Sequence, residues 1–127
     1  MPLVRISYTE GKPAGAAKAL SIAVQDALMA CFDVVADDYF QVITAHPAGL
    51  ENGPGLVGPE QFLGIDHTAD LVIVQITCAD GRTLDQKKAL YAAIAVNIAA
   101  TTDIRADDVF INLVESPREN CSFGNGV

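Results

Sequence analysis

The second residue of the chain is a proline, which offers a chemical group that no side chain provides. Initiator methionine is normally removed before a small residue such as proline, so processing would leave Pro2 with a secondary amine. An α-amino group titrates near pH ~8 in water, and burial beside a cation lowers its pKa because the charged form is disfavoured. Such an amine could act as a general base near neutral pH. The alternative is that Pro2 simply begins a strand, a position where proline is tolerated.

The spacing of the other reactive side chains does not indicate metal or thiol chemistry. The three cysteines, Cys31, Cys78 and Cys121, are widely separated and form no CxxC motif, and the two histidines are His46 and His67. A structural zinc site needs four closely spaced ligands. We therefore expect no metal site and interpret the cysteines as buried or bystander thiols in a reducing compartment.

Charge and hydropathy exclude several classes of partner. The 127 residues contain 8 Lys and Arg against 16 Asp and Glu, a formal charge of −8. Nucleic acid and anionic membranes bind through clustered basic residues, which this composition does not offer. No stretch approaches the ~20 consecutive apolar residues that span a bilayer, and the N-terminus lacks the pattern of a signal peptide. We expect residues 1–127 to form one cytoplasmic domain.

The elements that must position Pro2 are indicated by an internal repeat. At an offset of 70, residues 11–40 align with 81–110 without a gap, and eleven of the thirty pairs are identical. The most distinctive identities are Gly11 with Gly81, the Lys-Ala-Leu runs, and the Ala-Asp-Asp-x-Phe runs. The chain is one unit used twice, at about 2–46 and 70–116.

Each unit predicts a strand, a helix and a second strand. The first strands are the β-rich runs 3–8 and 71–77, and the last strands are 39–44 and 109–115. Apolar residues at helical spacing lie between them and predict a helix that packs on a sheet. In the first helix these residues are Ala17, Leu20, Val24, Ala27, Leu28 and Cys31.

The helix starts and the connection between the units also carry local signals. Thr83, followed three residues later by Gln86, predicts a capping box at the second helix, and Pro13 fits the start of the first. Residues 47–60 are rich in Gly and Pro and predict a loop rather than a linker, because neither half alone has enough core.

Two architectures fit a repeated strand-helix-strand unit. In one, each unit is a parallel crossover, and the halves join into a four-stranded sheet with both helices on one face. The other is the ferredoxin-like split arrangement, which is common in dimeric modules that bind small ligands. Hydrophobic periodicity does not separate the two.

Six sequence blocks, in order, resemble the tautomerase superfamily, and specifically its malonate semialdehyde decarboxylase branch. They are MPLVRIS (1–7), ADDYFQVI (36–43), FLGID (62–66), GRTLDQKKALY (81–91), DDVFINLVE (107–115) and ENCSFGNG (119–126). The resemblance covers essentially the whole chain. It implies the first architecture, an α+β fold with two β-α-β units, together with a homotrimer, a catalytic N-terminal proline, and neither cofactor nor metal.

Residue by residue, the resemblance places the catalytic proline at Pro2, a catalytic aspartate at Asp38 and the substrate-binding arginine at Arg82. Arg82 directly precedes the helix cap, where a ligand carboxylate would meet both a bidentate partner and backbone N–H groups. Asp38 lies between helix and strand, and its alternative role is that of a turn residue. Asp108 occupies the equivalent place in the second unit with no implied function.

Four residues depart from the family pattern. The decarboxylase carries two arginines spaced by one residue before the second helix, and here the first of these is Asp80, which disfavours decarboxylation. His67 and Tyr39 each stand where relatives usually have Arg, and Cys121 replaces a Trp. We expect His67 to be a loop residue without a catalytic role, and the pocket to be less cationic and less aromatic than is usual for the family.

The function that follows is a trimeric tautomerase acting on a small 2-oxo or β-keto acid. Neutral Pro2 would remove a proton next to the carbonyl, Arg82 would bind the substrate carboxylate, and Asp38 would orient a nearby group or water. One alternative is a decarboxylase or hydratase that uses protonated Pro2. A second alternative is a ferredoxin-like small-ligand-binding module with no catalytic role for Pro2, and a third is a family member whose pocket has decayed.

Overall fold

Each repeat folds as a strand, a helix and a second strand parallel to the first. The computed structural model describes residues 2–127. The first unit contains β1 (Leu3–Thr9), α1 (Ala16–Phe32) and β2 (Phe40–His46), and the second contains β5 (Val72–Ala79), α2 (Leu84–Thr101) and β6 (Val109–Ser116). Short 3₁₀ turns at Ala106–Asp108 and Arg118–Asn120 flank β6. No helix within residues 2–127 is long and apolar enough to span a bilayer.

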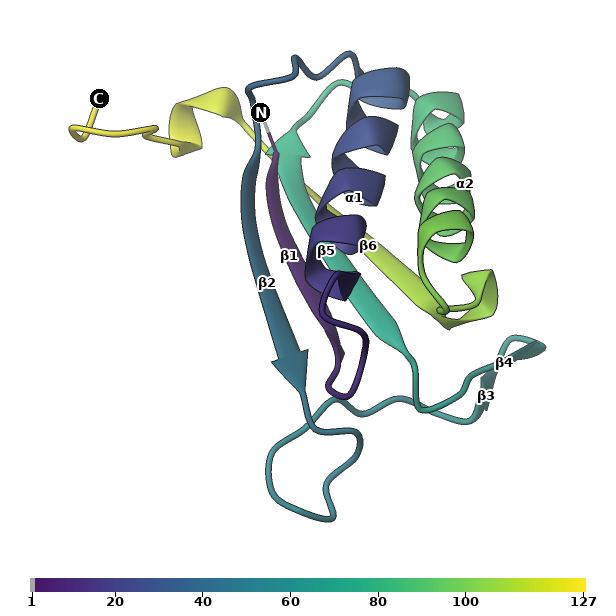
Figure 1. Ribbon diagram of the computed structural model, residues 1–127. Helices are drawn as coiled ribbons and strands as arrows, with labels where there is room; N and C mark the ends of the chain where they lie inside the picture. Colours follow the sequence, from purple (N-terminus) through teal and green to yellow (C-terminus); the bar gives the residue numbers. More distant parts are fainter. Residues whose placement is uncertain (1) are drawn as a thin grey trace.

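The four long strands form one mixed sheet in the order β2-β1-β5-β6, with both helices side by side on one face (Figure 1). Strands β1 and β2 are parallel, as are β5 and β6, whereas the central pair β1 and β5 is antiparallel. The predicted parallel-crossover architecture is therefore confirmed. The ferredoxin-like alternative is wrong, because the two strands of each unit hydrogen-bond directly to each other, with no third strand between them.

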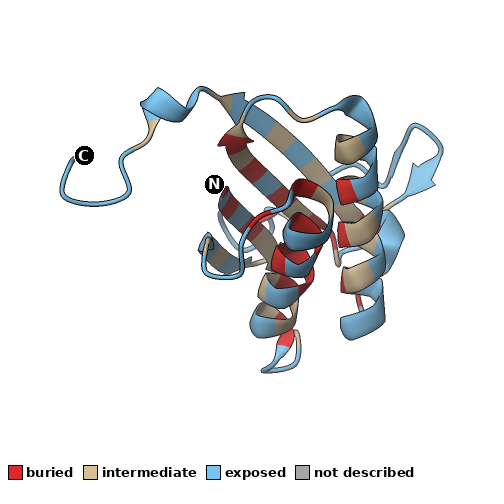
Figure 2. Ribbon diagram, turned by 90° about the horizontal axis from the view of Figure 1, so that it is seen from above, coloured by how far each residue is buried: buried red, intermediate tan, exposed pale blue. Residues whose placement is uncertain are grey.

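The core fills the space between the helices and the central strands (Figure 2). Its fully buried side chains include Val4, Ile6, Leu20, Val24, Leu28, Val74, Ile76, Leu90, Ile94 and Ile98. The apolar face predicted for α1 is buried at the centre of the helix, but at each end the neighbouring residue is buried instead of the predicted one. Ala16 and Phe32 are buried there, while Ala17 and Cys31 are only half-buried.

The predicted start of α2 is confirmed, whereas Pro13 lies before Gly15, the residue that caps α1, and is not part of that helix. The Gln86 amide nitrogen donates to Thr83 Oγ1 at 3.1 Å, and the Thr83 amide nitrogen donates to Gln86 Oε1 at 2.9 Å, which completes the capping box of α2. Helix α1 ends at Asp33, whose left-handed conformation (φ 55°) turns its N–H back to the Leu28 carbonyl. This turn directs the chain from α1 toward β2.

Residues 47–60 form a loop, and a small hairpin that the sequence did not reveal follows it. Strands β3 (Gln61–Phe62) and β4 (Ile65–Asp66) pair antiparallel around a tight turn. Leu63 and Gly64 both have positive φ in that turn, at 51° and 79°. The usual hairpin signal is Asn or Asp before Gly, so a leucine at the first turn position hides this hairpin from sequence inspection.

Candidate active site

Pro2 is buried at the end of the sheet where β1 begins. In the sheet register Leu3 lies opposite Phe40 of β2 and Thr77 of β5. One residue further along this register, Pro2 lies between the start of β2 and Cys78. Side chains alternate along a strand, so Pro2 shares the helix-facing side with the buried Val4. The expected removal of Met1 lies outside the described residues.

Arg82 lies at the same end of the sheet, in the short connection from β5 to α2. Its Nη1 donates to the Ala79 carbonyl at 3.0 Å, and its Nη2 donates to the Phe32 carbonyl at 3.3 Å. The guanidinium carbon also lies 4.8 Å from the centre of the Phe32 ring. Among residues 2–127, no carboxylate lies within ion-pair distance of Arg82. Within the described part of the chain, the groups that contact this half-buried guanidinium directly are two carbonyls and an aromatic ring.

The nearby carboxylate of Glu115 forms an ion pair with Lys87. Glu115 lies opposite Cys78 in the β5–β6 pair, and its Oε1 is 2.6 Å from Lys87 Nζ. That hydrogen bond lowers the pKa of Glu115 and raises the pKa of Lys87. Burial raises the pKa of the Cys78 thiol, an effect that the positive charge of Arg82 partly opposes. The thiol of Cys78 is therefore uncharged where it lines the region around Pro2.

Asp38 is half-buried in the turn between α1 and β2, one residue before the position level with Pro2. Its amide nitrogen donates to the Val35 carbonyl at 3.1 Å. The side-chain amide of Gln25 reaches this turn from α1, with Nε2 3.4 Å from the carbonyls of both Val35 and Asp38. The fold thus brings Pro2, Asp38 and Arg82 to one end of the sheet. Gln25 supports this turn but could not be predicted from the sequence, because a glutamine within a helix does not differ from an ordinary surface residue.

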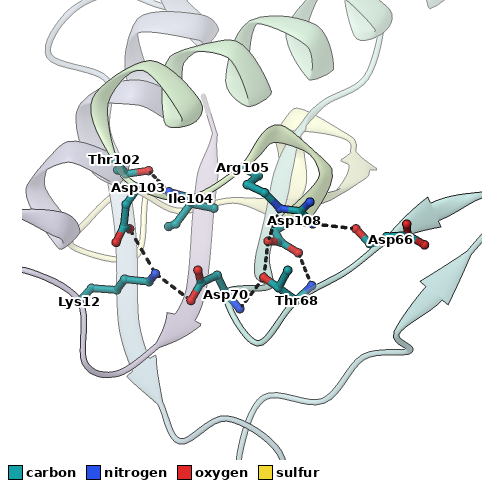
Figure 3. Close-up of polar contacts among 9 residues, drawn as sticks. All are labelled: Lys12, Asp66, Thr68, Asp70, Thr102, Asp103, Ile104, Arg105 and Asp108. Atoms are coloured by element: carbon teal, nitrogen blue, oxygen red, sulfur yellow. Dashed lines mark hydrogen bonds and ion pairs between the residues drawn. The ribbon is translucent and has the colours of Figure 1, made fainter.

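The aspartate equivalent to Asp38 has a structural role at the opposite end of the sheet (Figure 3). Asp108 is fully buried and accepts hydrogen bonds from the Thr68 amide at 2.7 Å and the Thr68 hydroxyl at 2.6 Å. Arg105 Nε lies 3.5 Å from the same carboxylate. Burial alone would raise the pKa of Asp108, but the Thr68 hydrogen bonds and the Arg105 charge outweigh it and lower the pKa.

The four departures from the family pattern lie in different places. Asp80 and Tyr39 are exposed near the end of the sheet that carries Pro2, and Cys121 is half-buried in the C-terminal tail. His67 lies just before β5, at the opposite end of the sheet, where its Nδ1 is 3.0 Å from the Pro59 carbonyl. A surface hollow beside His67 is lined by the 48–61 loop and residues 66–71, and it includes none of Pro2, Asp38 and Arg82.

Backbone N–H groups at the start of α2 are partly occupied. The sequence suggested that a ligand carboxylate at Arg82 would also meet these groups, but the capping box already satisfies the N–H groups of Thr83 and Gln86. Within residues 2–127, no cluster of three His, Cys, Asp or Glu side chains is arranged to hold a metal ion.

Comparisons with known proteins identify the family to which this fold belongs. Residues 38–124 match a family model described as "Tautomerase enzyme". The chain is 35% identical to the probable tautomerase YusQ of Bacillus subtilis (strain 168) over 99% of its own length and 95% of that protein. It is similar to the crystal structure of FG41 malonate semialdehyde decarboxylase inhibited by 3-bromopropiolate, with 30% identity, a TM-score of 0.88, and coverage of 98% of this chain and 91% of that one. A second malonate semialdehyde decarboxylase structure is 26% identical with a TM-score of 0.85, covering 98% of this chain and 92% of that one. The chain belongs to the tautomerase family of enzymes.

Proposed function

We propose that this protein moves a proton within a small 2-oxo or β-keto acid, with Pro2 as the general base. The observation that carries the proposal is the burial of Pro2 at the end of the sheet where Arg82, among residues 2–127, forms no ion pair with a carboxylate. After Met1 is removed, the neutral Pro2 nitrogen takes a proton from the carbon next to the carbonyl. It returns that proton at another carbon of the substrate. The reaction needs neither a metal nor a cofactor, and we place it in the cytoplasm.

Arg82 binds the substrate carboxylate in this proposal. A guanidinium has five N–H donors, and two of them are used on the carbonyls of Ala79 and Phe32. The three that remain can bind a carboxylate through paired hydrogen bonds. Asp38, at the same end of the sheet, orients a polar group of the substrate or a water molecule.

Burial and the nearby charge of Arg82 keep the Pro2 amine neutral, which is the form that a general base requires. Burial disfavours a charged amine, and the cation of Arg82 disfavours it further. Activity therefore falls as the pH drops below the pKa of the Pro2 amine, because the protonated amine cannot accept a proton.

A decarboxylase or hydratase is the second candidate, and the similarity to two malonate semialdehyde decarboxylase structures favours it. That chemistry uses protonated Pro2 to polarise the carbonyl, so its activity would be lost toward high pH instead. Asp80 stands close in sequence to Arg82, and its negative charge weakens the binding of a strongly polarised anion.

We propose a homotrimer as the active assembly. The sheet face opposite the helices carries exposed apolar side chains, namely Leu3, Phe40, Val42, Phe110 and Val114. Covering such a face removes apolar surface from water. Sedimentation at micromolar concentration tests this assembly, and a monomer or dimer would instead favour a small-ligand-binding module.

The decisive experiment combines mass spectrometry with enzyme kinetics. Intact mass establishes whether Met1 is absent, and ketonisation of 2-hydroxymuconate and of the enol form of phenylpyruvate is then compared among the wild type, Pro2→Ala and Arg82→Ala. We expect a loss of kcat for Pro2→Ala and a rise in KM for Arg82→Ala. Equal rates for all three Met-free proteins would contradict the proposal and would indicate a decayed pocket.

A further inference from the structure

The last residue of α1, Phe32, contacts Arg82 in two independent ways. Its ring lies 4.8 Å from the guanidinium carbon, and its carbonyl accepts a hydrogen bond from Nη2 at 3.3 Å. Phe32 is only 4% exposed, so its ring is fixed by the core. An aromatic face attracts a cation through the electrostatics of its π system, and more strongly where water is partly excluded.

The carbonyl contact uses the end of a helix. The last carbonyls of an α-helix have no partner within the helix and carry partial negative charge. Asp33 ends α1 in a left-handed conformation, and its N–H and that of Val34 turn back to the Leu28 carbonyl. The Phe32 carbonyl is left to accept from Arg82, which lies 50 residues further along the chain.

These contacts hold the cation without neutralising it. A carboxylate partner would fix the guanidinium equally well, but it would cancel the charge that an anionic substrate must meet. An aromatic ring and two carbonyls orient the guanidinium while its net charge and three of its N–H groups remain for a ligand.

We propose that Phe32 is a positioning residue that preorganises Arg82 for binding the substrate carboxylate. This inference rests on the role of Arg82 in the proposed function. Without the ring, the guanidinium must be ordered when the substrate binds, and that ordering weakens affinity. The chemical step at Pro2 is unaffected once the substrate is in place.

The kinetic test compares Phe32→Leu with substitutions at Ile98, which is equally buried but lies in α2 near the opposite end of the sheet. Phe32→Leu is expected to raise KM for phenylpyruvate about five-fold, the factor that corresponds to a partly desolvated cation–π contact, with kcat within about two-fold. Ile98→Val and Ile98→Ala lower stability by increasing amounts and should leave KM unchanged. Phe32→Met replaces Phe32→Leu if the latter does not fold.

A double-mutant comparison identifies the route of the effect. In an Arg82→Met background, Phe32→Leu should have no further effect on KM, because the group that it positions is gone. An equal rise in KM in both backgrounds would overturn the proposal. A rise in KM for Ile98→Ala as large as that for Phe32→Leu would do the same, because it would reflect lost stability alone.

A spectroscopic test separates this inference from the proposed function. In ¹⁵N-labelled protein, the Nε–H resonance of Arg82 should move when the Phe32 ring is removed, and the affinity for 3-phenylpropionate, a carboxylate that cannot tautomerise, should fall about five-fold. Both results without any Pro2-dependent turnover would refute the proposed function and leave the positioning role intact. An unmoved resonance with unchanged affinity would refute the positioning role.

Discussion

Lys12 and Arg82 occupy equivalent positions in the two repeats, yet within residues 2–127 only Lys12 is paired with carboxylates. Lys12 Nζ lies 2.8 Å from Asp70 and 3.2 Å from Asp103, and its side chain is 9% exposed (Figure 3). Arg82 contacts two backbone carbonyls and an aromatic ring instead. At one end of the sheet the cation is therefore neutralised by ion pairs, while at the other the described residues contact the cation through uncharged groups.

Substitution of Lys12 should lower the stability of the protein, whereas substitution of Arg82 should lower its activity. Lys12→Met is expected to lower the free energy of unfolding by about 1 kcal/mol, because the pairs are only partly buried, and to leave kcat/KM unchanged. Arg82→Met is expected to lower kcat/KM by about 100-fold, in line with the loss of a charged hydrogen-bond partner. Urea denaturation and phenylpyruvate kinetics measure the two effects. Equal activity losses for both variants would contradict the distinction between the two ends.

The pKa shift of Lys12 predicts how the stabilisation by its ion pairs depends on pH. Burial alone would lower this pKa, but the hydrogen bonds and charges of Asp70 and Asp103 outweigh it and raise the pKa. The stabilisation is therefore fully present below the unfolded pKa of about 10.4 and is lost as the pH rises through the folded value. The stability difference between wild type and Lys12→Met should persist through neutral pH and shrink only in strongly alkaline solution.

Asp108→Asn should destabilise the protein in a pH-dependent way. The lowered pKa of Asp108 means that its stabilisation is present above the unfolded pKa of about 3.9 and lost as the pH falls through the folded value. At pH 7 we expect a loss of about 2 kcal/mol, because Asn offers fewer acceptors to Thr68 and Arg105. Denaturation curves from pH 7 to 3 test this. Asp107→Asn, at an exposed site in the same turn, is the control and should have little effect at any pH.

Gly55→Ala should disrupt the loop 47–60. A Cβ at this position would lie 2.0 Å from the Gly49 carbonyl oxygen and 2.5 Å from that of Pro47, so the backbone itself would have to move. We expect a loss of at least about 1–3 kcal/mol, typical of overpacking. Gly15→Ala, at the N-cap of α1, is the matched control, because its Cβ would meet nothing within 4 Å and its φ of −84° suits alanine, and its cost should not exceed about 1 kcal/mol. Similar melting temperatures for the two variants would show that the loop is not packed in this way.

A charge on the helix-free face of the sheet should dissociate the proposed trimer. Phe110 is 51% exposed on that face, opposite Ile73 of β5, and Ile22 is 48% exposed on α1. Phe110→Glu would place a charge in a buried apolar interface, which is strongly unfavourable, whereas Ile22→Glu should leave the assembly intact. Sedimentation velocity distinguishes the two. A trimer that survives Phe110→Glu would exclude this face as the interface.

Much of the fold could be predicted from local patterns. The repeat at an offset of 70 indicated both β-α-β units, and the Thr83 and Gln86 pair fixed the start of α2, because a capping box depends only on residues in one turn. The choice between two sheet topologies was different. Strand pairing joins residues far apart in the sequence, and hydrophobic periodicity carries no information about it; only the resemblance of the six blocks indicated the correct topology.

The amino-acid sequence is enough to identify the reactive groups of the molecule, including a proline that processing can expose and an arginine at a helix start. It does not show that, within residues 2–127, Lys12 forms ion pairs with carboxylates while its counterpart Arg82 does not; that difference arises from the packed fold. The partners of these cations come from distant segments: Asp70 and Asp103 for Lys12, and the end of α1 for Arg82. Whether a charge is neutralised depends on which groups lie within a few ångströms, and that proximity exists only once the sheet and helices have packed.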